Sequence, residues 1–135
     1  MAEIMVDSNV LLDVLTEDPA WFKWSSLTLE ASAQGHVLAI NPVIYAEVSI
    51  SFDRIEDLEA ALPEALIERR PIPMEAAFLA GKCFLKYRQR GGRKQSTLPD
   101  FFIGAHAVVE GMTLLTRDVS RYRTYFPGLK LICPE

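Results

Sequence analysis

Short apolar runs alternate with longer helical segments along this chain, and that alternation restricts the possible folds more than any other feature. The runs with the length and character of buried strands are residues 4–6, 36–40, 67–72, 112–116 and 129–133. Short apolar strands joined through helices are typical of a parallel sheet that is covered on both faces. The length of 135 residues is that of one ordinary domain, so we expect a single α/β domain over residues 1–135.

The segments between these runs carry helix start and stop signals. Asn41 is a suitable N-cap followed by Pro42 at the first helical position, and Gly35 and Gly91 each follow a helical pattern. The expected helices are the segment after Asp7 and residues 17–35, 41–52, 53–66, 74–91 and 99–111. The first four predicted strands are therefore separated from one another by helix, as crossover connections require.

Composition excludes several classes of protein. Half of the residues are apolar and 24% are charged, a balance that is globular rather than disordered. The two cysteines form no CxxC pair and are too few for a disulfide scaffold. The net charge of −4 argues against binding nucleic acid through total charge, but a local basic patch stays possible. Neither a signal peptide nor a membrane-spanning run is recognisable, and we expect a cytoplasmic protein.

Two acids come directly after predicted strands. Asp7 follows the run Ile4 to Val6, and Asp118 stands just past residues 112–116. In open parallel sheets the functional site lies outside the carboxyl ends of the strands. An ionised carboxylate is unfavourable in an apolar setting without a partner, so Asp7 in particular suggests a function. Asp118 has an alternative role as the N-cap of a short following helix.

Two further acids lie on apolar helix faces. Glu47 shares its face with Val43, Ile44 and Ile50, and Asp100 lies in the first turn of its predicted helix. Taken alone, Glu47 is compatible with a solvated helix edge and Asp100 with complementing a helix dipole. We expect the remaining candidate, Asp13, to be a surface acid.

Four converging carboxylates would repel one another unless some were protonated or a cation were bound. Oxygen ligands of this kind suit Mg²⁺ or Mn²⁺, and Mg²⁺ is commonly held by one or two carboxylates together with waters and substrate phosphates. A divalent ion of this type assists hydrolysis of phosphodiesters. The pattern therefore indicates metal-dependent phosphodiester chemistry.

Three blocks carry a resemblance to a known family: "IMVDSNVLLDVL", "NPVIYAEV" and "LPDFFIGAHAVVEGMTLLTRD". In this order they resemble the PIN-domain ribonucleases, and most closely the VapC-type toxins of bacterial toxin–antitoxin pairs. The resemblance continues through "RYRTYFPGLKLICP" and covers essentially the whole chain. It implies a three-layer α/β/α fold around a parallel sheet and an endoribonuclease activity with Mg²⁺ or Mn²⁺. It also implies a homodimer and a cognate VapB-type antitoxin.

Site residues follow from the same resemblance. Asp7, Glu47, Asp100 and Asp118 match the acidic quartet of the family, which binds the metal and carries out catalysis. Asn9 and Thr116 stand where the family often has polar side chains that support the acids. The implied reaction is in-line attack of water on an RNA phosphodiester, which leaves a 5′-phosphate and a 3′-hydroxyl.

A basic run precedes the segment that carries Asp100. The candidates for RNA contact are Arg88, Arg90, Arg93 and Lys94 in "KYRQRGGRKQS", with Arg117 and Arg121 on either side of Asp118. The alternative for the basic run is a solvated helix end that only maintains solubility. A metal-free ribonuclease would need two positioned histidines, and we expect both His36 and His106 to be structural or surface residues.

Two alternative functions are open from the sequence. One is a catalytically inactive interaction module that kept the fold. The other is a metal-dependent phosphatase on a similar sheet, but a phosphatase of the haloacid-dehalogenase type would need an aspartate where Asn9 stands. Loss of RNA cleavage in an Asp7→Asn variant that still folds would distinguish the nuclease from both.

Overall fold

The computed structural model describes residues 2–92 and 98–135. Within them the strands are β1 (Glu3–Val6), β2 (Val37–Ile40), β3 (Ile67–Arg69), β4 (Thr113–Leu115) and β5 (Leu131–Ile132). The helices are α1 (Ser8–Leu15), α2 (Phe22–Ala33), α3 (Pro42–Ser49), α4 (Ile55–Ala61), α5 (Met74–Gln89), α6 (Leu98–Val109) and α7 (Ser120–Tyr125). The predicted alternation of strands and helices is confirmed.

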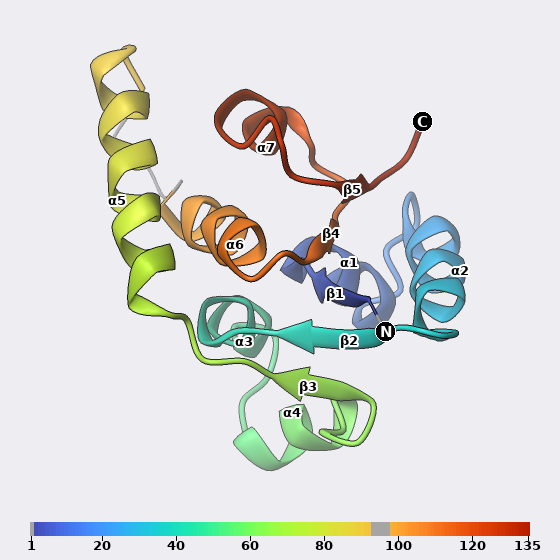
Figure 1. Ribbon diagram of the computed structural model, residues 1–135. Helices are drawn as coiled ribbons and strands as arrows, with labels where there is room; N and C mark the ends of the chain where they lie inside the picture. The colour runs from blue at the N-terminus through green and yellow to red at the C-terminus, as the bar shows by residue number, and fades with distance from the viewer. Residues whose placement is uncertain (1, 93–97) are drawn as a thin grey trace.

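The strands form one sheet in the order β3-β2-β1-β4-β5, and every neighbouring pair is parallel. Strand order reverses at β1, because β2 and β3 extend the sheet to one side and β4 and β5 to the other. Helices α1 and α2 pack against each other, as do α5 and α6, and α3 contacts both α1 and α6. Figure 1 shows α5 and α6 side by side, with α2 across β1 and β4 from them. The predicted α/β/α architecture is confirmed.

The core lies on both faces of the central strands. Ile4, Met5 and Val6 of β1 are all buried, as expected for a strand covered on both sides. Phe101 of α6 is fully buried and packs its ring against Tyr125 and Phe126 near α7. These contacts fix α6 and α7 next to each other, and each of them begins at or beside an acid of the predicted quartet.

Helix α6 also approaches the segment after α7 unusually closely. A Cβ atom added at Gly104 would lie 2.5 Å from Cε2 of Phe126, so only glycine permits this approach. The ring of Phe126 therefore lies directly on the backbone of α6.

The start of α3 follows its predicted local signal, and the start of α2 does not. Asn41 caps α3 by accepting a hydrogen bond of 2.9 Å from the amide of Ile44, as predicted. The helix expected from residue 17 instead begins at Phe22, which corrects the prediction. The cause is Asp18, whose Oδ1 accepts the amides of Ala20 and Trp21 at 2.9 Å and forms a turn around Pro19.

No helix within residues 2–92 and 98–135 is both long and apolar enough to span a bilayer.

Candidate functional site

Asp7 is held by the polar groups of three different segments. It follows β1 and caps α1, where the amide of Ser8 donates to its Oδ1 at 2.7 Å. Its Oδ2 accepts the hydroxyl of Thr116 at 2.8 Å and that of Tyr122 at 2.9 Å. Its exposed fraction is only 3%. The side chain is therefore fixed in direction, with its carboxylate inside the protein at the end of a central strand.

The environment of Asp7 disfavours its charge. Burial and the nearby charge of Glu47 raise the pKa of Asp7, while the hydrogen bonds from Thr116, Tyr122 and Ser8 oppose that shift. Burial and the negative charges of Asp7 and Asp100 also raise the pKa of Tyr122 well above its usual value. Tyr122 is therefore a neutral hydrogen-bond donor at physiological pH.

Glu47 reaches the same region from α3. Ser8 Oγ donates to its Oε1 at 2.8 Å, so the residue after Asp7 connects two acids of the quartet. Burial raises the pKa of Glu47, and the charge of Asp100 adds to this effect. The alternative of a solvated helix edge does not describe this side chain, which is half-buried and accepts the hydrogen bond from Ser8.

Asp100 lies in the first turn of α6, where its Oδ2 accepts Arg121 Nη1 of α7 at 3.0 Å. Burial and the charge of Asp7 raise the pKa of Asp100 to about 6, with Asp118 adding to the shift and Arg121 opposing it. The charges of Asp7, Glu47 and Asp100 thus act on one another across the carboxyl edge of the sheet. Asp118 contributes from the loop after β4.

Asp118 is the most exposed of the four acids. Its amide donates to Thr116 Oγ1 at 3.2 Å, and Ser120 Oγ lies 3.4 Å from its Oδ1. Thr116 Oγ1 also accepts Asn9 Nδ2 at 3.1 Å. The two supporting residues expected from the sequence therefore lie beside Asp7, and Thr116 connects Asp7 with Asp118.

The oxygen-rich donor set fits a hard divalent cation. Within residues 2–92 and 98–135, no three His, Cys, Asp or Glu side chains are close enough together to form a ready-made metal cage. Mg²⁺ does not need such a cage, because it often takes one or two carboxylates and completes its shell with water. The pKa of each of Asp7, Glu47 and Asp100 is raised in part by the charge of another of the three, and a bound cation would relieve this repulsion.

The basic candidates divide into different environments. Arg121 contacts Asp100 directly, and its guanidinium lies over the ring of Tyr87 at 5.4 Å. Arg90 lies over the ring of Tyr125 at 5.6 Å, and Arg88 over that of Phe84 at 6.0 Å. The two remaining residues of the basic run, Arg93 and Lys94, lie outside the described residues.

Arg117 has a different partner from the one expected. Its Nε and Nη2 donate to the two carboxylate oxygens of Asp13 at 2.7 and 3.0 Å. Asp13 is only 2% exposed, so the prediction that it is a surface acid is wrong. The charge of Asp13 is tolerated inside the protein because Arg117 and the hydroxyl of Ser25, at 2.7 Å, satisfy it.

The histidines have the structural or surface positions expected of them. His36 is exposed. His106 is fully buried, with Nδ1 3.1 Å from Asn41 Nδ2 and Nε2 2.6 Å from Glu110 Oε1. Because Asn41 Oδ1 accepts from Ile44, its Nδ2 donates to His106, which fixes the imidazole between α3 and α6.

Sequence reasoning missed two residues of the site, Ser8 and Tyr122. Ser8 could have been noticed from its place next to Asp7 at a helix start. Tyr122 gives no comparable signal, because it is 115 positions from its partner and lies in a short aromatic helix. Its role depends on the packing of α7 against α6.

Comparison with known proteins agrees with this architecture. The profile of the PIN domain family matches residues 4–127. A chain of the VapBC2 complex from Rickettsia felis, solved bound to a promoter DNA fragment, superposes with a TM-score of 0.75, 20% identity and coverage of 98% of this chain and 99% of that one. VapBC-1 from nontypeable Haemophilus influenzae gives a TM-score of 0.73 at 17% identity, with 97% of each chain covered.

FitAcB from Neisseria gonorrhoeae has the same fold, with a TM-score of 0.70, 16% identity and 96% of each chain covered. A comparison with curated proteins gives no significant match. The family match extends from β1 through α7 and includes all four acids at the carboxyl edge of the sheet. The chain therefore belongs to the PIN domain family.

Proposed function

We propose that this protein is a Mg²⁺- or Mn²⁺-dependent endoribonuclease that acts as the toxin of a toxin–antitoxin pair. The observation that carries the proposal is a set of three carboxyl groups at one edge of the sheet, those of Asp7, Glu47 and Asp100. Burial and the negative charge of another member of the set raise the pKa of each one. Such perturbed carboxylates cluster at functional sites. Membership of the PIN family, which is typically one of nucleases, supports the same conclusion.

Asp7 and Asp100 would hold the metal ion. When bound, the ion would neutralise charge on a phosphate and make a water molecule more acidic. The Ser8 amide, Thr116 and Tyr122 donate to Asp7 at 2.7, 2.8 and 2.9 Å, and Ser8 Oγ at 3.4 Å and Asn9 Nδ2 at 3.5 Å make longer contacts. These hydrogen bonds would keep the Asp7 carboxylate in one orientation toward the ion.

Glu47 and Asp118 would act around that centre. The raised pKa of Glu47 suits a group that accepts a proton from the attacking water, because a general base works best with a pKa near the working pH. Asp118 is more exposed and adds negative charge at the opening of the site. Thr116 and Tyr122 hold Asp7 in orientation during the reaction.

RNA would approach along α5 and α7. Arg88 and Arg90 lie at the end of α5, and Arg121 stands at Asp100 itself. Arg93 and Lys94 extend this basic run in the sequence. The positive side chains would offset repulsion between phosphates and the acids. Single-stranded or loop RNA is favoured, because its backbone is accessible to a site at a sheet edge. An RNA substrate would place the protein in the cytoplasm.

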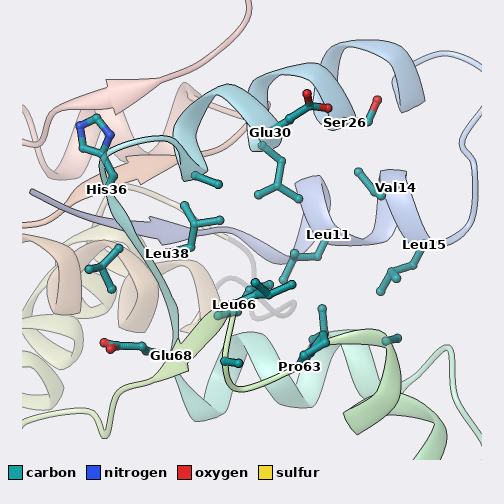
Figure 2. Close-up of a pocket in the computed structure, with 17 residues that line it drawn as sticks. Leu11, Val14, Leu15, Ser26, Glu30, His36, Leu38, Pro63, Leu66 and Glu68 are labelled. Atoms are coloured by element: carbon teal, nitrogen blue, oxygen red, sulfur yellow. The ribbon is translucent and has the colours of Figure 1, made fainter.

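An apolar groove offers a place for a VapB-type antitoxin. It has a volume of about 550 Å³ and lies between α1, α2 and the segment from α4 to β3. Figure 2 shows Leu11, Leu38 and Leu66 directed toward one another in it, with Glu30 and Glu68 at its margins. Leu66 is 71% exposed and belongs to the contiguous apolar lining of this groove, and contiguous exposed apolar surface is typical of interaction sites. An amphipathic helix with basic residues on its polar face fits a groove with an apolar lining and acidic margins.

The complexes that share this fold support an antitoxin partner, since VapBC assemblies are named for both components. We propose in addition that the protein forms a homodimer, to be tested by light scattering. For the groove, Leu66→Asp should weaken inhibition by a cognate VapB-type antitoxin and leave cleavage intact. Unchanged inhibition would place the antitoxin elsewhere.

The deciding experiment measures cleavage of a labelled single-stranded RNA with Mn²⁺, with EDTA, and by the Asp7→Asn variant. We expect cleavage only with metal, products with a 5′-phosphate and a 3′-hydroxyl, and loss of activity in Asp7→Asn with an unchanged circular dichroism spectrum. Equal cleavage in EDTA would overturn the metal dependence. Failure of the wild-type protein to cleave any RNA would support the inactive interaction module instead.

A further inference from the structure

Arg117 is attached to α1 at two points. Its guanidinium forms the bidentate ion pair with Asp13, and its backbone amide lies 3.3 Å from Asn9 Oδ1. Asn9 and Asp13 are four residues apart in α1 and so share one face of that helix. The ring of Trp21, which lies 5.4 Å from the guanidinium carbon, provides a further contact. Both the main chain and the side chain of Arg117 are thus directed toward α1.

The segment held in this way carries two residues of the site. Thr116 and Asp118 are the immediate neighbours of Arg117, and Thr116 Oγ1 contacts both Asp7 Oδ2 and the amide of Asp118. Asp7 is the N-cap of α1, the same helix that carries Asp13. Residues 116–118 therefore contact α1 at both ends of the helix. Thr116 contacts Asp7 at its start, and Arg117 contacts Asp13 further along it.

We propose that Arg117 is a positioning residue, and that its ion pair with the buried Asp13 sets Thr116 and Asp118 beside Asp7. Arg117 then has no direct contact with RNA phosphate, in contrast to the role that its place in the sequence suggests. This inference rests on the proposed function for its effect on catalysis. Its geometric part, the attachment of residues 116–118 to α1, stands independently of that function.

The test compares Arg117→Gln and Asp13→Asn with their double variant, and uses two controls. Arg90→Gln removes a proposed RNA contact, and Arg54→Gln removes a charge from a solvent-exposed ion pair with Glu56. The first measurement is the affinity for Mn²⁺ by electron paramagnetic resonance. We expect about a tenfold loss in each single variant and no further loss in the double variant, because both substitutions break the same interaction. Arg54→Gln should be unchanged.

The second measurement is the salt dependence of binding to a fluorescent single-stranded RNA in EDTA. Each phosphate contact contributes about 0.7 to the slope of log affinity against log salt for single strands. We expect Arg117→Gln to keep the wild-type slope, whereas Arg90→Gln should lower its magnitude by that amount. A lower slope in Arg117→Gln, or full Mn²⁺ affinity in Asp13→Asn, would overturn the positioning role.

Two further measurements keep the outcomes distinct. If a single variant does not fold, Asp13→Leu combined with Arg117→Met removes both charges together and should fold, with weakened Mn²⁺ binding and an unchanged salt slope. Wild-type-like Mn²⁺ binding in that variant would contradict the inference. If the wild-type protein neither binds Mn²⁺ nor cleaves RNA, the proposed function fails. Faster hydrogen exchange at the Asp118 amide in Asp13→Asn would then still support the attachment, and unchanged exchange would refute it.

Discussion

Tyr122 donates a hydrogen bond of 2.9 Å to Oδ2 of Asp7, across 115 positions of the chain. The tyrosine is buried in α7, and the aspartate directly follows the central strand β1. This contact connects the last helix of the fold to the most buried acid of the site. It makes the orientation of Asp7 dependent on a helix of only six residues.

Tyr122→Phe should therefore weaken metal binding without unfolding the protein. The variant removes one hydroxyl and keeps the ring, and a hydrogen bond to a charged group contributes about 1.5–3 kcal/mol. We expect at least about a tenfold loss of Mn²⁺ affinity, equivalent to about 1.4 kcal/mol. Electron paramagnetic resonance of Mn²⁺ measures this loss, and Tyr125→Phe serves as the matched control in the same helix. Equal affinities in the wild type and Tyr122→Phe would show that Thr116 and Ser8 orient Asp7 without help.

Arg121→Gln should change metal and RNA binding in opposite directions. In the wild-type protein the guanidinium of Arg121 neutralises Asp100, and its positive charge repels a divalent cation bound at Asp100. We expect tighter Mn²⁺ binding in the variant, by about three- to tenfold, and weaker binding of single-stranded RNA. Fluorescence anisotropy in EDTA measures the RNA affinity. A loss of both affinities would indicate that Arg121 serves mainly to hold α7 in place.

The pKa of Asp100 predicts how stability depends on pH in the absence of metal. Burial and the charge of Asp7 raise that pKa to about 6 in the folded protein, whereas the unfolded value is about 4. The folded state therefore binds more protons in this interval, and the contribution of Asp100 to the free energy of unfolding should rise as the pH falls from about 7 toward about 4.

Urea denaturation of the wild type and of Asp100→Asn at several pH values isolates this contribution, since other carboxylates titrate in the same range. The stability difference between the two proteins should be largest at neutral pH, with the variant the more stable. It should shrink as the pH is lowered through 6. Parallel curves over this interval would contradict the shifted pKa.

Gly104→Ala should destabilise the fold. Its Cβ would lie 2.5 Å from Cε2 of Phe126, and overpacking of this kind lowers the free energy of unfolding by about 1–3 kcal/mol. Gly81 in α5 provides a matched control, because a Cβ there meets nothing within 4 Å. Gly81→Ala should be stabilising by about 0.5–1 kcal/mol, since alanine restricts the unfolded chain and favours helix. Thermal denaturation that ranks the two substitutions in the reverse order would contradict this packing.

The sequence was sufficient to place the acids and the sheet, because both depend on local patterns. Asp7 and Asp118 follow apolar strands, and parallel strands bring their carboxyl ends to one edge. Such arguments need only the spacing of apolar residues along a helix or strand and the direction in which that element runs. Glu47 lies on an apolar helix face, but the sequence alone left a solvated helix edge open, and its selection depended also on the family resemblance.

The partners of buried polar groups were not predictable in the same way. Asp13 was misjudged because its burial depends on Arg117, which lies 104 positions away and reaches it only in the folded chain. The late start of α2 depends on Asp18, which competes for backbone amides that a helix would otherwise use. A contact across the fold decides the burial of Asp13, and a local side-chain hydrogen bond decides where α2 begins; the apolar periodicity of one segment indicates neither.

The outermost strands of the sheet are short: β3 has three residues and β5 has two. Each leaves a narrow rim of backbone amides and carbonyls on which a strand from another molecule could dock. Such truncated borders protect a protein from uncontrolled edge-to-edge polymerisation. Any specific assembly of this protein, with a second copy or with an antitoxin, therefore has to form mainly through its helical surfaces.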